Sequence, residues 1–179
     1  MPPIVLMDLF EAMRERRSIR RFKPEPVPKE ALEKIIQAGI LAPSAGNLQS
    51  RKFFVLTGQA KKGFGAAVPT GGRFQLGHEP AVIVVCADRA AIVGRYGQRG
   101  VELYTRLDCA ASIMSMLLAA HGLGLGAVWV GSCDFGAIRQ ALRLPGSLEP
   151  VSIIALGYPD EKPEMPPRKG MQEACEFLE

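Results

Sequence analysis

The segment 81–87, Ala-Val-Ile-Val-Val-Cys-Ala, constrains the fold most, because it is apolar at seven consecutive positions. Side chains alternate between the two faces of a strand, so this strand is apolar on both faces, which predicts a central position in its sheet. A second apolar segment, 101–121, has Leu, Ala and Met residues at helical spacing round most of its circumference. This pattern predicts a long helix that is buried.

Shorter patterns predict the other elements of a single domain over residues 1–179. Helices are expected at 8–16, 29–41 and 135–142, and strands at 52–57, 127–130 and 151–156. The strand at 52–57 is expected to be buried. Residues 59–64 suit a short helix, and glycines then turn the segment up to residue 77 into a mobile loop. A proline-rich arm follows residue 157 and allows a closing helix.

The composition is that of an ordinary globular domain. Of the 179 residues, 47% are hydrophobic and 22% are charged, which provides enough apolar material for a core. We find no secretory leader pattern and no run approaching 18 uninterrupted apolar residues, so we expect a cytoplasmic protein that does not enter a membrane. The four cysteines form no CxxC pair, which argues against a metal site and against disulfides and favours reduced core residues.

Residues 16–22 read Arg-Arg-Ser-Ile-Arg-Arg-Phe and concentrate hydrogen-bond donors. From Arg14 to Lys23 there are six basic residues and one acid, Glu15. Several guanidinium groups beside a Ser hydroxyl suit a phosphate or a carboxylate. The net charge of +4 is small, so the positive field is local and fits a small anion better than a nucleic acid. The alternative is a solvated basic surface.

Residues 42–50, Ala-Pro-Ser-Ala-Gly-Asn-Leu-Gln-Ser, form a second informative stretch. Small residues allow the backbone to approach a ligand closely, and the side chains of Ser44, Asn47 and Gln49 can bond to its polar edge. A plain turn between a helix and a strand is the alternative.

No set of side chains for acid–base or nucleophilic catalysis is recognisable in the sequence. There is no G-x-S-x-G motif, and His78 and His121 are interpreted as structural or surface residues. The glycines at 122–126 follow a helix and precede a strand, the reverse of the order in a dinucleotide-binding loop. With an anion site but no catalytic set, the simplest enzyme is one in which a bound cofactor performs the reaction.

Four motifs occur in the order found in the nitroreductase family of flavin enzymes, which this chain resembles over nearly its whole length. They are residues 16–20 (RRSIR), 42–49 (APSAGNLQ), 124–131 (GLGAVWVG) and 156–159 (LGYP), the last followed by Arg168-Lys169. The resemblance implies an α+β fold with a mostly antiparallel central sheet wrapped by helices. It also implies an intertwined homodimer with two FMN sites at the subunit interface.

The resemblance also assigns roles in FMN binding. The residues carried over to the phosphate, the ribityl chain and the pyrimidine edge are Arg16, Arg17, Ser18 and Arg20. Two more would help at the phosphate, Arg168 and Lys169. The residues expected from the other subunit are Pro43, Ser44 and Asn47. The backbone expected to face flavin N5, where a donor stabilises charge on the reduced ring, belongs to Gly131 and Ser132.

The implied function is an FMN-dependent oxidoreductase that passes hydride from NADH or NADPH to a nitroaromatic, a quinone or a similar planar acceptor, with ping-pong kinetics. Dehalogenation, flavin fragmentation and non-catalytic flavin binding are alternatives. A nucleic-acid-binding module is a weaker one, because Phe22 is the one aromatic residue adjacent to the arginines. Many members of the family have Pro-Trp after the Gln of the loop, whereas Ser50-Arg51 follows Gln49 here. The wall near the flavin is therefore expected to differ.

Overall fold

Four strands form the sheet at the centre of the molecule, and all neighbouring pairs are antiparallel. Their spatial order is β1 (Arg51–Thr57), β2 (Ala81–Asp88), β4 (Leu148–Gly157) and β3 (Gly126–Val130). The structure is a computed structural model that describes residues 8–71, 74 and 76–178. The predicted central strand is β2, which is buried from Ala81 to Ala87, and the α+β class with an antiparallel sheet is confirmed.

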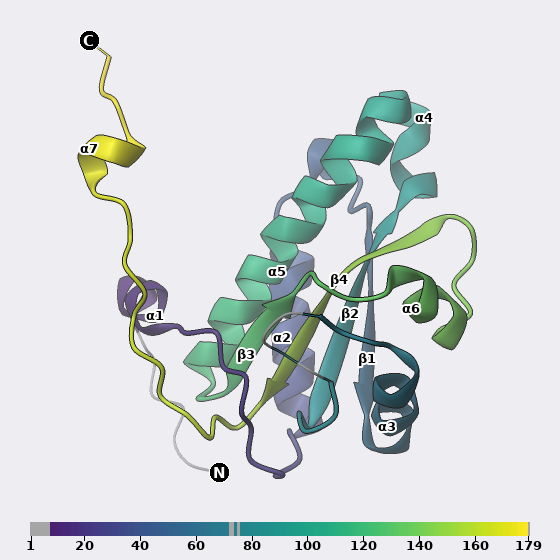
Figure 1. The fold of residues 1–179 in the computed structure, drawn as a ribbon. Coiled ribbons are helices and arrows are strands. Elements are labelled where there is room, and N and C mark those ends of the chain that lie inside the picture. The colour runs from purple at the N-terminus through teal and green to yellow at the C-terminus, as the bar shows by residue number, and fades with distance from the viewer. Residues whose placement is uncertain (1–7, 72–73, 75, 179) are drawn as a thin grey trace.

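Helices cover both faces of this sheet, as Figure 1 shows. One face packs against α2 (Lys29–Leu41) and α5 (Thr105–Gly122), and the other against α3 (Gly58–Ala67) and α6 (Phe135–Ala141). In β2, Ile83 belongs to the first of these two cores and Val84 to the second. The apolar pattern of this strand therefore follows from its position between two helical layers.

The helix α2 has the predicted range because prolines set both of its ends. It begins after Pro28 and ends before Ala42 and Pro43, where the helical conformation is disfavoured. Its buried side faces α5, and a Cβ atom added at Gly39 would lie 2.9 Å from Cγ of Met116. The small residue lets the two helices pack closely on the sheet.

The strand predicted at 52–57 is present, but the prediction that it is buried is wrong. Among the described residues β1 pairs with β2 alone, at the edge of the sheet, and each of its seven residues is half-buried or exposed. An apolar run such as Phe53 to Leu56 occurs in edge strands and in central strands alike, so the sequence pattern could not distinguish them.

The long helix predicted at 101–121 is interrupted in the structure. A π-helical turn, η2 (Gly100–Tyr104), joins α5 to a helix that was not predicted, α4 (Arg89–Arg99). The Asp88 carboxylate caps α4 by accepting hydrogen bonds from the N–H groups of Ala90 and Ala91. An Asp at this position is a typical helix start, and it is the sequence signal that indicates α4.

The helix α5 is buried on one side only. Ile113 and Met116 pack in the core, whereas Leu103, Leu107 and Met114 are 43%, 56% and 40% exposed. We call the surface formed by these three residues the outer face of η2 and α5. Because it is exposed, the prediction that the helix is buried is wrong for this side of the helix in a single chain. By length and composition alone the helical run Arg89–Gly122 would suffice to cross a membrane, but its inner side packs as a core helix does.

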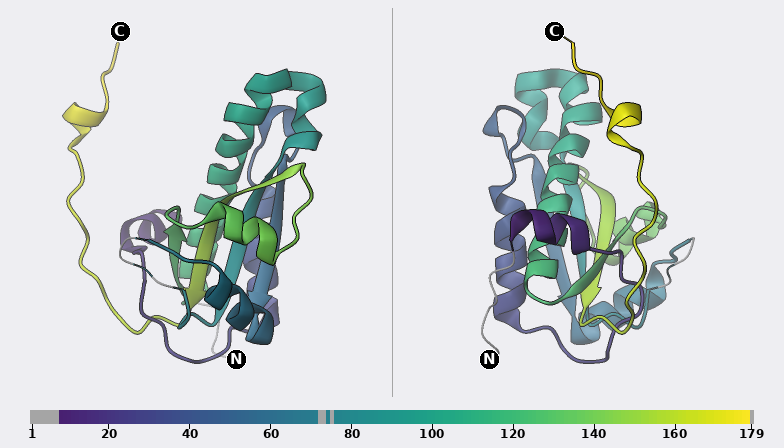
Figure 2. Two further views of the ribbon diagram at one scale, coloured as in Figure 1. Left: turned by 45° about the vertical axis from the view of Figure 1, so that its right-hand side comes forward. Right: turned by 90° about the vertical axis from the view of Figure 1, so that its left-hand side faces the viewer.

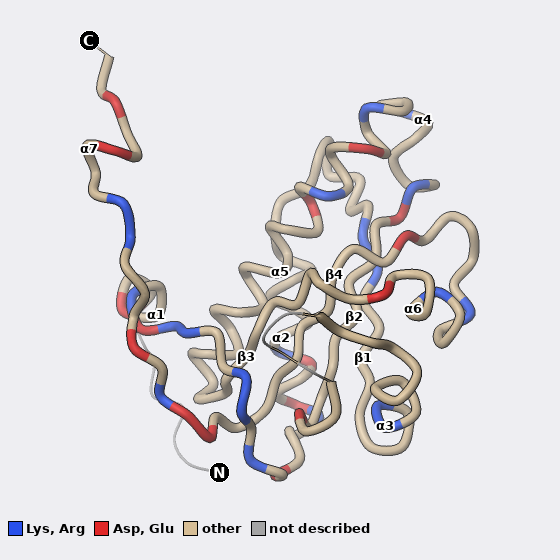
Figure 3. The backbone as a smooth tube through the Cα atoms, viewed as in Figure 1, with Lys and Arg blue, Asp and Glu red and all other residues tan. Residues whose placement is uncertain are grey.

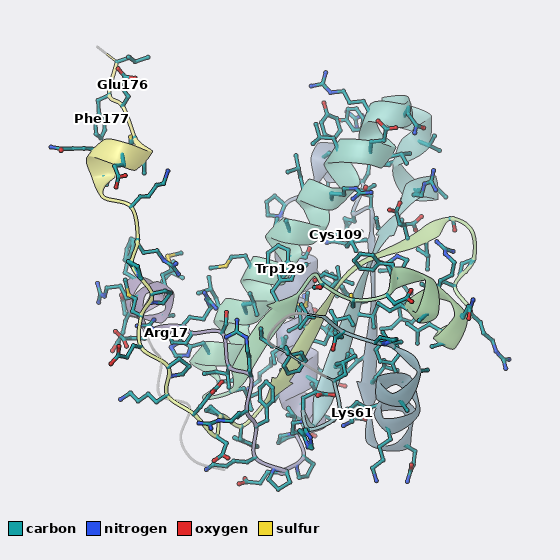
Figure 4. The ribbon with its side chains drawn as sticks, in the orientation of Figure 1. Arg17, Lys61, Cys109, Trp129, Glu176 and Phe177 are labelled. Atoms are coloured by element: carbon teal, nitrogen blue, oxygen red, sulfur yellow. The ribbon has the colours of Figure 1, made fainter. Side chains whose placement is uncertain are left out.

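The helix α3 extends beyond the predicted range 59–64 and ends at Ala67. A buried ion pair ties it to the segment before β2, as Nζ of Lys61 (labelled in Figure 4) lies 3.7 Å from Oε1 of Glu79. The same Nζ donates to the carbonyl oxygen of Gly77 at 2.9 Å. Residues 72, 73 and 75 of the predicted glycine-rich loop lie outside the described residues, so its mobility stays a prediction.

After Tyr158 the chain leaves the domain as an extended arm (Figures 1 and 2). The arm passes α1 (Leu9–Glu15) and carries the short helix α7 (Met171–Ala174), so the predicted arm and closing helix are confirmed. Phe177 and Leu178, near its end, are 80% and 87% exposed. These side chains therefore gain no apolar burial from the part of their own chain that the structure describes.

Gly157, at the end of β4, occupies a position where no side chain fits. A Cβ atom there would overlap the Pro80 ring, lying 2.8 Å from its Cγ, and would approach Cδ1 of Phe22 to 3.3 Å. We expect Gly157→Ala to destabilise the fold by about 1–3 kcal/mol, measured by urea unfolding. Gly146→Ala is the matched control, because the space around Gly146 is open. An equal loss of stability in both variants would contradict this packing.

Candidate functional site

The arginine-rich segment follows α1 and runs beside the first residues of β3. Its backbone is extended from Arg16 onward, and the N–H of Ile19 donates to the carbonyl oxygen of Ala127 at 3.1 Å, next to a parallel bridge. The side chains of Ile19 and Phe22 are buried. They anchor the segment and leave the polar residues around them free to face a ligand.

Arginines from this segment and from the C-terminal arm converge on one cavity of about 290 Å³, which we call the arginine cleft. Its walls are formed by Arg16, Arg17, Ser18, Arg20, Pro163, Glu164, Pro166 and Arg168. Figure 3 shows the basic residues after α1 beside the charged residues of the arm. The structure thus brings together the residues predicted for the phosphate end of a ligand, except Lys169, which does not line the cleft.

Two arginines that line the cleft have buried donors without acceptors in the described part of the chain. Nε of Arg16 and Nε of Arg17 are buried and have no hydrogen-bond partner in the described part of the chain. Burial lowers the pKa of Arg16, and the positive charges of Arg168 and Arg17 lower it further. An anion would supply both the missing acceptors and the missing counter-charge, so the arrangement indicates an anion site.

Some donors of the cluster are already bonded within the chain. Nη1 of Arg17 (labelled in Figure 4) donates to the carbonyl oxygens of Arg14 and Arg16, at 2.6 and 3.0 Å. Arg17 thereby caps the C-terminal end of α1. Nη1 of Arg20 donates to the carbonyl oxygen of Ser18 at 3.3 Å. These bonds orient Arg17 and Arg20 along the wall of the cleft.

Glu161, in the arm, is a site residue that the sequence did not indicate. Its carboxylate accepts hydrogen bonds from the N–H groups of Arg20 and Arg21 and lies 3.4 Å from Nε of Arg21. These contacts fix the arm against the arginine segment and neutralise Arg21, which does not line the cleft. No local pattern could have revealed a contact between residues 141 positions apart.

His121, which the sequence did not associate with the arginines, lies near the end of α5 beside them. With Arg16 and Arg17 it lines an adjoining cavity of about 280 Å³. Its Nε2 is buried and has no partner among the described residues, and burial, followed by the charge of Arg16, lowers the pKa of its imidazole. The imidazole is therefore neutral at pH 7 and adds no positive charge to the cluster.

Gly131 and Ser132 lie beyond the end of β3 that is farther from the arginine cleft. Gly131 is four positions beyond Ala127, or about 13 Å along a strand. The carbonyl oxygen of Ser132 accepts a hydrogen bond from the N–H of Gly71 at 2.7 Å, which fixes this end. Trp129 is 44% exposed between the two ends (Figure 4). An elongated ligand along β3 could therefore reach from the arginines to Gly131.

The loop 42–50 lies at the opposite end of the domain from the arginine cleft. It carries three predicted site residues, Pro43, Ser44 and Asn47. The N–H of Ala45 donates to Oδ1 of Asp108, in the first turn of α5, at 2.9 Å. His121, beside the cleft, is 13 positions further along the same helix, or about 20 Å away. Within one chain, the structure does not bring this loop to the cleft.

The cysteines and the acidic residues were the other candidates for a site. Among the residues that the structure describes, no three His, Cys, Asp or Glu side chains are grouped so that they could hold a metal ion. The cysteines are free: Cys86 and Cys109 are buried, Cys133 is half-buried and Cys175 is exposed. The prediction of core cysteines therefore holds for Cys86 and Cys109 and is wrong for Cys175.

Cys133 follows Ser132 directly, and its reactivity can be predicted from its surroundings. Burial, and then the charge of Asp134, raise the pKa of the Cys133 thiol to about 11. At pH 8 only about one such thiol in a thousand is ionised, so iodoacetamide should modify exposed Cys175 well before Cys133. The Cys133 rate should rise about tenfold per pH unit below pH 11, measured by peptide mass spectrometry. Equal rates for the two cysteines at pH 8 would contradict this account.

The fold and the cleft define an α+β domain with an anion site placed for an elongated ligand on an edge strand. Comparison with known families gives a match to the nitroreductase family over residues 13–70 and 67–158. The chain therefore belongs to the nitroreductase family, and the resemblance based on the four motifs is confirmed.

Relatives and solved structures agree with this assignment. A protein of Methanothermobacter thermautotrophicus, whose name gives NADH dehydrogenase and NAD(P)H nitroreductase as candidate activities, is 35% identical over 164 residues, covering 88% of this chain and 80% of that protein. The oxygen-insensitive NADPH nitroreductase of Salmonella typhimurium is 32% identical over 167 residues, covering 89% of this chain and 69% of that protein. A structure from Desulfovibrio desulfuricans, solved in complex with FMN, is 30% identical and has a TM-score of 0.79 over 98% of this chain and 99% of that chain.

Proposed function

We propose that this protein is an FMN-dependent oxidoreductase that uses NADH or NADPH to reduce a nitroaromatic, a quinone or a similar planar acceptor. The observation that carries the proposal is the arginine cleft, whose residues Arg16 and Arg17 have buried donors without acceptors among the residues that the structure describes. A terminal phosphate is a dianion whose oxygens accept several such bonds at once. The FMN complex from Desulfovibrio and the NADPH in the name of the Salmonella relative support these cofactors.

The described residues fit FMN along the arginine cleft and β3. The phosphate and the ribityl chain would be held by Arg16, Arg17, Ser18, Arg20 and Arg168, with Lys169 near the rim. The strand β3 leads from the cleft toward Gly131 and Ser132, whose backbone would face the ring. When bound, FMN supplies the redox chemistry, taking hydride from NADH or NADPH and passing it to the acceptor.

The second half of the site would come from another copy of the chain. Asp108, which bonds to the loop 42–50, and His121, beside the arginine cleft, are about 20 Å apart along α5, so within one chain the loop does not reach the cleft. A homodimer would place Pro43, Ser44 and Asn47 of one subunit at the flavin of its partner. The exposed outer face of η2 and α5 supports this proposal, because an apolar surface of this kind is typical of an interface.

The chain itself contributes binding and orientation to the reaction. The arginine cleft fixes the phosphate, and backbone groups at Gly131 and Ser132 set the polarity beside the ring. Donor and acceptor would occupy the same pocket in turn, which gives ping-pong kinetics. Cys133→Ser should leave turnover intact, because the protonated thiol takes no part in the reaction.

The cytoplasm, where NADH and NADPH are available, is the location we propose.

The experiment that tests this function is an absorption spectrum of the purified protein, followed by an assay of NADH and NADPH oxidation. We expect a yellow protein that releases FMN on denaturation and gives parallel lines in double-reciprocal plots. A colourless protein that fails to bind added FMN would overturn the proposal. Bound FMN without oxidation of either nucleotide would instead identify a non-catalytic flavin carrier.

A further inference from the structure

Ser50 and Arg51, where the chain departs from many members of its family, both form hydrogen bonds within their own chain. The Ser50 side chain is fully buried below the loop 42–50, and its hydroxyl donates to Oδ2 of Asp108 at 2.6 Å. Nη2 of Arg51 donates to the carbonyl oxygens of Ile40 and Ala42, at 2.9 and 2.6 Å. Both residues therefore support the loop from its own chain, and the expectation of a different wall near the flavin stays a prediction.

Asp108 joins the middle of the loop to its end. Its Oδ1 accepts a hydrogen bond from the N–H of Ala45, while its Oδ2 accepts one from the Ser50 hydroxyl. Asp108 is only 5% exposed and uses both carboxylate oxygens on the loop, so it is not placed to bind a ligand on the surface of the domain. The Ser50 carbonyl oxygen accepts from the N–H of Asp88 at 2.9 Å, which ties the end of the loop to β2.

The loop needs such support because its backbone is unusual. It contains the short turn η1 (Ala45–Asn47), and the φ angles of Gly46, Asn47 and Gln49 are 55°, 55° and 50°. Asn47 and Gln49 are not glycines, and backbone of this kind persists only where the surroundings hold it. The loop also packs against Tyr96 of α4, whose hydroxyl would lie 2.7 Å from a Cβ atom added at Gly46. Space for the loop is therefore limited at Gly46 as well.

We propose that Asp108 is a positioning residue that holds loop 42–50 in the shape that contacts the flavin of the partner subunit. This inference rests on the proposed function, in which Ser44 and Asn47 act in a second copy of the chain. Asn47 is exposed at the crest of the loop and Ser44 is half-buried, whereas Asp108 and Ser50 lie beneath them. A binding group must be held close to its working geometry by the residues behind it, and here these are Asp108 and Ser50.

A purely structural role for Asp108 makes a different prediction. If Asp108 only stabilised its own domain, its loss would weaken the arginine cleft of the same chain. If Asp108 positions the loop, its loss weakens the cleft of the partner and leaves its own cleft intact. Mixed dimers separate the two roles, because each flavin site then combines the cleft of one variant with the loop of the other.

The first measurement is FMN affinity, by flavin fluorescence quenching, in homodimers of Asp108→Asn, Asp108→Ala and Ser50→Ala. We expect the dissociation constant of the two Asp108 variants to rise about tenfold or more, and that of Ser50→Ala to rise less. Glu149→Gln is the matched control, since the Glu149 carboxylate bonds to Arg106 of α5 at 2.9 Å, and the substitution so removes a carboxylate partner of the same helix away from Asp108. Its FMN affinity should equal that of the wild type.

The decisive measurement is the FMN stoichiometry of a dimer that combines Asp108→Ala with Arg16→Ala. One of its two sites then combines the intact cleft of the Asp108→Ala subunit with the intact loop of the Arg16→Ala subunit. We therefore expect one FMN per mixed dimer at wild-type affinity, although the homodimer of each variant binds FMN weakly. If Asp108→Ala does not fold, Asp108→Asn takes its place. A wild type that does not bind FMN would refute the proposed function. If the wild type binds FMN, two results would overturn this inference alone. One is a mixed dimer without a tight site, and the other is normal FMN affinity in every Asp108 and Ser50 variant.

Discussion

Arg16→Ala is expected to weaken FMN binding about tenfold or more, and Arg168→Ala to do the same. Both side chains line the arginine cleft, and Nε of Arg16 is buried without an acceptor among the described residues. A charge-assisted hydrogen bond contributes about 1.5–3 kcal/mol, and about 1.4 kcal/mol corresponds to a tenfold change in the dissociation constant. Titration of the FMN-free protein with FMN, followed by fluorescence quenching, measures the effect.

The same two substitutions should not destabilise the protein without FMN. Burial, and then the like charges of Arg168 and Arg17, lower the pKa of Arg16, so removing one member of the cluster relieves repulsion. Thermal unfolding of the FMN-free variants should therefore occur at or above the wild-type temperature. Arg89→Ala, at the start of α4, is the matched control for both measurements. Unchanged FMN affinity in folded Arg16→Ala and Arg168→Ala would rule out the cleft as the phosphate site.

The double variant Leu103→Glu/Leu107→Glu is expected to be monomeric and to lose tight FMN binding. Both residues lie on the outer face of η2 and α5 and are 43% and 56% exposed. Burial of one Leu side chain contributes about 1.5–3 kcal/mol, and in a twofold dimer each substitution occurs twice. Because only about half of each side chain is exposed and available for burial, the total is about 3–6 kcal/mol, which corresponds to at least about two orders of magnitude in the dimer dissociation constant.

Sedimentation equilibrium distinguishes a 19.4 kDa monomer from a dimer of twice that mass. Lys62→Glu, on the exposed side of α3, changes the charge in the other helical layer and serves as the control. The control should stay dimeric and bind FMN normally. A wild-type monomer that binds FMN tightly at micromolar concentration would contradict the two-chain site.

Much of the fold could be predicted because local sequence determined it. Prolines set the ends of α2, and seven apolar residues in succession placed β2 at the centre of the sheet. The arginine segment was found for a similar reason, because its donors lie within a few residues of one another. Its meeting with Arg168 could be expected only from the family resemblance, since no periodicity connects the segment to the arm.

The features that escaped prediction depend on distant contacts or on a second chain. The bond from Ala45 to Asp108 joins residues 63 positions apart, and that from Ser50 to Asp108 joins residues 58 apart. Periodicity showed that α5 is apolar nearly all round, but it cannot tell a side covered by the sheet from a side left for a partner. Residues such as Leu107 were therefore expected to be buried, whereas they are exposed in the single chain.

The most direct test of the arginine cleft compares FMN with riboflavin, which lacks the phosphate, in the wild type and in Arg16→Ala/Arg168→Ala. The four dissociation constants form a thermodynamic cycle, which isolates the interaction between the phosphate and the two arginines from all other contacts of the flavin. We expect the wild type to bind FMN about a hundredfold or more tighter than riboflavin, and the double variant to distinguish them only a few-fold. A ratio of dissociation constants that is the same in both proteins would show that the phosphate is bound elsewhere.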